Sequence, residues 1–383
     1  MAISILSQPV SPLESFTHHI WSVASDNANV RQIEARVFES GVLQFPPIRV
    51  QSSLGSTSAF NVDLQELLRD QTSFDLQDPA VTATAYTAPN SSYNYDAISF
   101  TELIDVNGKL ELGVTNLQAT SKTTVNAARQ VFNSPGLPDR IIAAPAPTPN
   151  KFLTNSNRTL EIREGESYQL SLYASTTDTN AIIIQWLEAD GSAISTNRID
   201  YTGAVGRYDI CVGLANLATA GITQPANAAS YNVYVAEFQN PGIVRHSEII
   251  NFKIVSGCGT RLHFMNRWGG FDSLTLAERR QELNVSSTRY EKYLAAGFTT
   301  RDRGRQNQYR TPTPRILAST KLISDTTAEW LEELIGSPIA FWEKDGVLIP
   351  VTVDDGNFRT KDSEPVQLDI SFTLANDRRN QRL

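Results

Sequence analysis

Short runs of alternating apolar and polar residues, separated by turn-forming residues, recur along most of the chain. Alternation with a period of two places apolar side chains on one face of an extended strand and polar ones on the other. The segment VRQIEARVFES at 30–40 and the segment VQLDISFTLA at 366–375 are clear examples. In the second, Leu368, Ile370 and Phe372 share one face. This pattern predicts a mainly β protein whose sheets are antiparallel.

The length and a proline-rich stretch predict how the chain divides. A chain of 383 residues corresponds to about two to three domains. Residues 134–150 contain five prolines, which lack the backbone N–H that a central strand needs, so they predict a linker. Charge and pattern change again after Gly257. We therefore predict an N-terminal β-rich domain at 1–145 ending in that linker, an immunoglobulin-like sandwich at 146–257 and a C-terminal α+β assembly domain at 258–383.

The first two domains are predicted mostly from strands and turns. Residues 97–103 and 109–117 alternate on either side of an Asp-Val-Asn-Gly turn, which indicates a hairpin, whereas residues 59–71 indicate a short helix or turn. Between 151 and 257, about six or seven short strands within about 105 residues are typical of an immunoglobulin-like sandwich. Trp186 is expected to fill its core, and Cys211 is expected to be buried.

The third domain contains the clearest helix. Residues 324–338, SDTTAEWLEELIGSP, place Thr326 three residues before Glu329, which predicts a capping box. A hairpin with Asp345-Gly346 at its turn should follow. The helix is expected to bury one apolar face, formed by Trp330, Leu331, Leu334 and Ile335.

Charge is distributed unevenly. The chain has 33 basic and 41 acidic residues, and its net charge of −8 argues against a general nucleic-acid coat protein. Residues 1–257 carry 15 basic and 24 acidic residues, whereas 258–315 carry 11 and 5. An acidic body with a basic segment favours docking between copies or partners, although a solvated loop remains the alternative.

The arginines near residue 305 form the sharpest charge feature. Their glycine, glutamine and asparagine neighbours favour an exposed loop, and arginine forks suit contacts with carboxylates. We predict a protein interface, with a solvated loop as one alternative and nucleic-acid contact as the other. The nucleic-acid alternative lacks an interleaved aromatic pattern, because Tyr309 stands alone. The run consists of Arg301, Arg303, Arg305, Arg310 and Arg315.

Motifs for nucleotides, hydrolysis and metals are missing from the sequence. It contains no GxGxxG, no P-loop, no GxSxG, no HExxH and no CxxC. The stretch from Asp105 to Glu111 is too short for a calcium loop and indicates a hairpin turn. We therefore predict no catalytic, cofactor-binding or metal site, and no enzyme activity.

Targeting signals are not recognisable either. The first twelve residues lack a signal-peptide pattern, and no run of about 18 apolar residues occurs. Synthesis in the cytoplasm, no membrane insertion and free thiols at Cys211 and Cys258 are the corresponding expectations.

The most specific string is CGTRLHFMNRWGGFDSLTL at 258–276. It resembles a pattern of tail-associated structural proteins of phages and phage-like elements of Bacteroidota-type hosts. Residues 327–342, the following IPVTVDDGNF segment and, more weakly, AFNVDLQELL near the N-terminus are similar to the same proteins. The matching residues of the string are Phe264, Asn266, Arg267, Trp268, Gly269, Gly270, Phe271, Asp272 and Ser273.

The resemblance implies a virion structural protein of the tail or baseplate, without enzyme activity, in contact with its own copies and neighbouring tail proteins. It also implies that FDSLTL is extended, whereas the residues themselves leave open a helix beginning at Ser273. Trp268 and Phe271 would anchor a core or a subunit contact. The alternative function is a receptor- or carbohydrate-binding module at a tail tip, which would bind a host-surface glycan.

Overall fold

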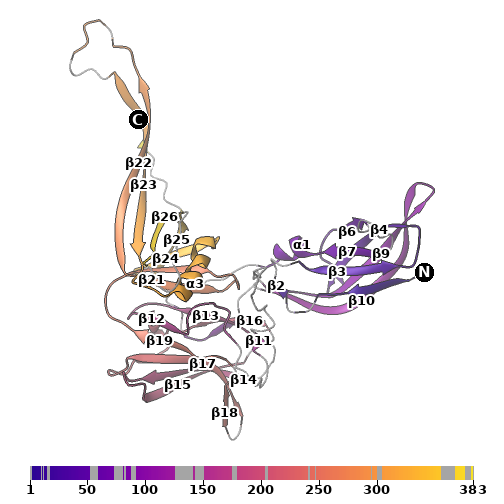
Figure 1. Cartoon of the computed structure of the whole chain (residues 1–383), viewed down its shortest axis with the longest axis horizontal. Coiled ribbons are helices and arrows are strands. Elements are labelled where there is room, and N and C mark those ends of the chain that lie inside the picture. Colours follow the sequence, from indigo (N-terminus) through magenta and orange to yellow (C-terminus); the bar gives the residue numbers. More distant parts are fainter. Residues whose placement is uncertain are drawn as a thin grey trace.

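A computed structural model gives the fold, which is mainly β, with 58% strand and 8% helix. It forms three units along the chain (Figure 1). The structure describes the chain except for residues 1, 10, 12, 15–17, 52–58, 73–80, 82, 88–91, 126–140, 143–150, 175–178, 203–205, 240–241, 246, 295, 300–303, 355–366, 376–380 and 383.

The N-terminal unit is a sandwich of two sheets. One has the strand order β1-β3-β7, and the other has the order β2-β10-β9-β4-β5 with β6 also on β4. Trp21 and Phe100 meet between the sheets, with ring centroids 5.7 Å apart. The strands are β1 (Ile3–Ser7), β2 (Leu13–Glu14), β3 (Ile20–Ser25), β4 (Val30–Glu39), β5 (Val42–Leu43), β6 (Ile48–Gln51), β7 (Ala59–Asp63), β9 (Ser92–Val106) and β10 (Lys109–Val125).

Turn chemistry explains the hairpins of this unit. Asn107 and Gly108 have φ values of 55° and 81°, the left-handed pair that suits a two-residue hairpin between twisted strands. The predicted turn between β9 and β10 is therefore confirmed. The stretch 59–71 contains strand β7 followed by the short helix α1 (Gln65–Arg69), which buries Leu68.

The central unit is the second sandwich. Its sheets have the orders β11-β13-β16-β8 and β12-β19-β17-β14-β15, with β18 on β17. Trp186 is fully buried in the core, as predicted, and packs 5.0 Å from Tyr231. The elements are β8 (Ala85–Thr87), β11 (Ile141–Ile142), β12 (Thr159–Ile162), β13 (Gln169–Ala174), β14 (Thr179–Leu187), β15 (Ala193–Thr202), β16 (Gly206–Cys211), α2 (Leu214–Thr219), β17 (Ser230–Gln239), β18 (Gly242–Arg245) and β19 (Ile250–Ile254).

Two segments of this unit depart from a purely sequential division. Strand β8 lies inside the range predicted for the first domain, yet it pairs with β16. Within the proline-rich stretch, β11 pairs in parallel with β13, while 134–140 and 143–150 lie outside the described residues. Pairing of distant segments adds strands to a sheet edge without leaving a local signal in the sequence. The helix α2 is a further element that the pattern did not predict.

The C-terminal unit is a single sheet with one helix. The strand order is β21-β20-β24-β25-β26-β23-β22, with β27 also on β23. Helix α3 covers one face, where Trp330 packs 5.6 Å from Phe264. The elements are β20 (Thr260–Met265), β21 (Phe271–Leu276), β22 (Glu278–Glu291), β23 (Arg305–Ser319), α3 (Asp325–Gly336), β24 (Ala340–Lys344), β25 (Val347–Val353), β26 (Asp369–Leu374) and β27 (Gln381–Arg382).

Three local predictions for this unit can be compared with the structure. FDSLTL forms strand β21, so the alternative helix from Ser273 is wrong. The helix is present, but its N-cap is Ser324, whose side chain accepts from the Thr327 N–H, and not Thr326. Ser324 lies one residue before the first helical residue, which is where a cap oxygen can reach the free N–H groups. The Asp345-Gly346 turn is confirmed, with φ values of 53° and 75°.

Candidate functional site

The motif at 258–276 forms a tight connection between β20 and β21. The Asn266 side-chain oxygen accepts from the backbone N–H groups of Trp268 and Gly270, both at 3.0 Å. Its amide nitrogen donates to the Leu153 carbonyl of the central unit at 2.9 Å. A single asparagine therefore shapes the turn and fastens it to the neighbouring unit.

Trp268 and Phe271 lie inside the chain and not on its surface. Their exposed fractions are 0% and 1%. The Arg267 guanidinium lies 4.9 Å from the Trp268 ring, and the Phe271 ring lies 6.1 Å from that of Phe341. Of the two roles predicted for these aromatics, their burial within the single chain supports the core. A subunit contact at these residues stays a prediction.

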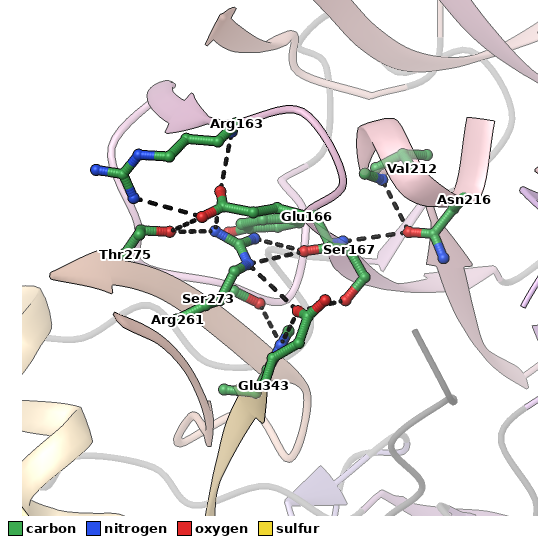
Figure 2. Close-up of polar contacts among 12 residues, drawn as sticks. Arg163, Glu166, Ser167, Val212, Asn216, Arg261, Ser273, Thr275 and Glu343 are labelled. Carbon is green, nitrogen blue, oxygen red and sulfur yellow. Dashed lines mark hydrogen bonds and ion pairs between the residues drawn. The ribbon is translucent and has the colours of Figure 1, made fainter. Parts of the chain in front are cut away.

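The junction between the central and C-terminal units is polar and buried (Figure 2). Arg261 on β20 extends into the 163–168 connection of the central sandwich. Its Nε donates to the Ser167 carbonyl at 3.0 Å, and its Nη1 donates to Glu166 Oε2 at 3.1 Å and to Thr275 Oγ1 at 2.8 Å. Arg261 is 3% exposed. A buried guanidinium with several acceptors fixes the relative position of two units, because a shift between the units would break several charge-assisted hydrogen bonds at once.

A second chain of hydrogen bonds runs through His263. Its Nε2 lies 2.7 Å from Glu343 Oε2, and its Nδ1 lies 2.8 Å from Ser273 Oγ. Glu343 also accepts from Ser167 Oγ at 2.9 Å, so this chain reaches the central unit as well.

The protonation of this pair follows from its surroundings. Burial lowers the pKa of His263, so the imidazole is neutral at pH 7. Burial acts to raise the pKa of Glu343, but the hydrogen bond from His263 and the Arg261 charge outweigh it, and the pKa lies below its usual range. Neutral His263 therefore donates from Nε2 to the carboxylate and accepts at Nδ1 from the Ser273 hydroxyl.

The hydrogen-bonded series Ser273, His263 and Glu343 resembles the serine, histidine and carboxylate of a hydrolytic triad in composition. Here the glutamate binds Nε2 and the serine binds Nδ1, the reverse of the usual arrangement. Ser273 is 4% exposed and His263 is 1% exposed. A nucleophile must reach a substrate carbonyl, and this hydroxyl lies between two packed units. We assign these side chains to positioning of the junction.

Asp272 is a third buried charge-bearing group at the same turn. Its Oδ2 accepts from Thr154 Oγ1 at 2.8 Å and from Trp330 Nε1 at 2.7 Å, which links the central unit, β21 and α3. Burial, with a smaller contribution from Glu333, raises the pKa of Asp272 to about 7. The group can therefore change its protonation state near neutral pH without leaving the interior.

The arginine run is placed differently from its prediction. Residues 305–319 form strand β23 rather than an exposed loop, because they pair along their length with β22. Arg305 Nε donates to Glu291 Oε1 at 2.6 Å, and both side chains are exposed. Arg315 Nε donates to Asp354 Oδ2 at 2.8 Å, and Arg310 is exposed on β23. Arg301 and Arg303 lie outside the described residues.

Strands β22 and β23 form an arm that projects from the body of the molecule (Figure 1). Large apolar side chains remain exposed on it, at fractions that range from 40% to 101%. A group of water-exposed apolar side chains on a projecting element is typical of an interaction surface, and a second such group lies on β9 and β10. Those of the arm are Leu283, Val285, Tyr290, Tyr293, Leu294 and Phe298.

The sequence matches no protein-family model and no curated protein. Among the described residues, no group of three or more His, Cys, Asp and Glu side chains could hold a metal ion. No helix in the described part of the chain has the length and apolar character that crossing a membrane requires.

The junction residues were missed at the level of sequence. In TRLHFM, Leu262 and Phe264 alternate with Arg261 and His263, which reads as one core face and one solvated face. The structure shows both faces buried, the second against the central unit. One signal for this junction was available. Arg261 and His263 lie two residues apart, so both point to the same face of the strand.

Proposed function

We propose that the protein is a structural component of a phage tail or baseplate region and assembles in several copies through protein–protein contacts. The observation that carries the proposal is the β22–β23 arm, which presents exposed apolar and arginine side chains away from the three packed units. The motif-level resemblance of residues 258–276 to tail-associated structural proteins supports the same role.

A rigid body supports an assembly role because it holds the arm in a defined direction. The core of the C-terminal unit continues into the base of the arm, where Ile316 and Ala318 of β23 are buried. The polar junction at Arg261 in turn holds this unit on the central sandwich. An arm anchored in this way loses little further conformational freedom when it docks.

The tryptophan side chains favour assembly over glycan recognition. Flat tryptophan faces stacked on sugar rings would need exposure, but the five tryptophans are between 0% and 7% exposed. The exposed aromatics Tyr290, Tyr293 and Phe298 instead follow one another near the end of the arm. A host-surface glycan therefore remains the less favoured partner.

Removing the outer arm tests the proposal. Replacing residues 289–308 by Asn-Gly joins Thr288 directly to Tyr309, its register partner, through a two-residue hairpin turn. We expect the melting temperature to stay within a few degrees, because the outer arm adds little to the core. Incorporation into purified phage particles, measured by quantitative mass spectrometry, should fall at least tenfold.

Substitution of apolar residues on another projecting hairpin provides the matched control. Leu110→Ser with Leu112→Ser changes side chains that are 45% and 65% exposed at the β9–β10 end, and this variant should be incorporated normally. Wild-type incorporation of the shortened arm, or absence of the intact protein from purified particles, would contradict the proposal.

A further inference from the structure

Strand β22 is the last strand of the C-terminal sheet, and the backbone shows which of its residues face outward. The Ser319 carbonyl accepts from Ala277 N–H at 2.8 Å on the β22 side, whereas Thr320 N–H donates to the Leu368 carbonyl at 2.9 Å on the β26 side. Backbone groups alternate along a strand, so from Tyr309 to Ser319 the odd-numbered residues of β23 face β22 and the even-numbered ones face away. Their register partners in β22, such as Glu282 opposite Arg315, face β23.

The outer edge of β22 therefore carries the backbone groups of its odd-numbered residues. No described strand pairs with this edge. These groups can accept another strand, because β22 contains no proline. The outward residues are Arg279, Gln281, Leu283, Val285, Ser287, Arg289 and Glu291.

The opposite edge of the arm is closed in contrast. Pro312 and Pro314 are even-numbered residues of β23, so their nitrogen atoms lie on the edge away from β22. Proline has no N–H to donate, and prolines at an edge prevent strand addition there. Next to these prolines, β27 already pairs with β23 at Tyr309 and Arg310, so among the described residues the outer edge of β22 is the open side of the arm.

We propose that β22 of one copy pairs antiparallel with β22 of a second copy, about a two-fold axis at Val285. This proposal rests on the assembly role above and names its partner. Two edges that present the same odd-numbered residues can pair in this way and extend both sheets into one. Val285 then lies opposite its own copy, and Leu283 lies opposite Ser287.

Charge selects this register over its neighbours. With the axis at Val285, Arg279 lies opposite Glu291 at both ends of the interface. With the axis at Asn284, Arg279 would lie opposite Arg289, and with the axis at Ser286, Arg280 would lie opposite Lys292. Like charges directly opposite each other destabilise a strand pair. In the single chain, the Arg279 guanidinium lies 5.5 Å from the Trp342 ring. Glu291 already accepts from Arg305, but the Arg305–Glu291 ion pair is exposed, so a second guanidinium can reach the same carboxylate.

Apolar side chains reinforce the same pairing. Leu283 and Val285 are 60% and 52% exposed and share one face of β22. Pairing about Val285 gathers both side chains from both copies into one cluster across the axis. Their exposure in the single chain is thereby explained, because the partner strand removes them from water.

Disulfide trapping tests the register directly. Exposed Cys258 is first replaced by serine, and buried Cys211 is kept. In this background we expect Val285→Cys to form a disulfide-linked dimer under mild oxidation, since hydrogen-bonded antiparallel partners have Cα atoms about 5.5 Å apart. Leu283→Cys is the matched control on the same face. Its two copies would lie about 14 Å apart along the strands and should not become linked. Linkage of Leu283→Cys without Val285→Cys would overturn the proposal.

Sedimentation tests the edge itself. The wild-type chain should form a dimer of twice 42.3 kDa, and Ser287→Pro should raise the dimer dissociation constant at least tenfold, whereas Ser287→Ala should not. Both variants should keep the wild-type melting temperature, because the Ser287 N–H faces outward. A monomeric wild-type chain, or a Ser287→Pro variant that dimerises normally, would overturn the edge pairing. Presence of a monomeric chain in phage particles would leave the assembly role standing, whereas a trapped dimer absent from particles would refute that role alone.

Discussion

Asp272 is the residue whose protonation most directly links solvent conditions to stability. Its pKa of about 7 in the folded chain lies above the value of about 3.9 expected after unfolding. The folded state therefore holds an extra proton between these values, and the free energy of unfolding falls as pH rises from about 4 to about 7. Three pKa units correspond to a loss on the order of 4 kcal/mol.

Asp272→Asn should remove this pH dependence. The amide oxygen can still accept from Thr154 and Trp330, and no carboxylate is left to ionise in the interior. We expect the variant to be more stable than the wild type at pH 8 and nearly equal to it at pH 4.5. Urea unfolding followed by tryptophan fluorescence at both values measures the difference. Equal slopes for the two proteins would show that Asp272 stays ionised throughout.

The β20–β21 turn fits against the central sandwich through a glycine. A Cβ on Gly270 would lie 2.6 Å from Ser171 Oγ and 2.9 Å from Ser171 Cβ. Gly270→Ala should therefore push the turn away from the sandwich and cost about 1–3 kcal/mol of stability. Gly336→Ala at the end of α3 meets nothing within 4 Å and should be neutral or slightly stabilising. Thermal unfolding of both variants compares them, and an unchanged Gly270→Ala melting temperature would contradict the close fit.

Elements with strong local chemistry could be predicted from the sequence, and those that depend on distant partners could not. The turn at Asp345-Gly346 and the alternating strand β26 follow from their own residues. Strand β8 depends on β16, more than 100 residues later. The polar composition of the arginine-rich segment favours a loop and gives no sign of its pairing with β22. Likewise, the burial of Arg261 and His263 on β20 could not be predicted, because burial against another unit leaves no periodic signal in the sequence.

The central and C-terminal units are held together by charges with very different surroundings. Arg261 is buried between them, whereas Lys321 Nζ contacts Glu161 Oε2 at 2.7 Å with both side chains about half exposed. Arg261→Ala leaves Glu343 buried beside only the neutral His263, and Glu166 with only Arg163 as a cation, and should cost about 3–5 kcal/mol. Lys321→Ala should cost only about 0–1 kcal/mol.

Calorimetry of the full chain distinguishes these effects. We expect Arg261→Ala to separate a low-temperature transition of one unit from the main unfolding peak, whereas Lys321→Ala should retain the wild-type profile. Identical profiles for the two variants would mean that the junction does not depend on its buried guanidinium.

The hydrophilic junction also affects what the protein exposes while the ribosome is still making it. The central sandwich is completed at β19, before β20 and β24 are synthesised, and domains emerging from the ribosome generally fold in that order. Its docking side at that moment carries Glu166, Ser167 and backbone carbonyls, which water can hydrate until Arg261 arrives. An apolar docking side would instead expose aggregation-prone surface until about the next hundred residues had been translated. Nascent chains on neighbouring ribosomes of one messenger RNA therefore do not expose an apolar docking side through which they could aggregate.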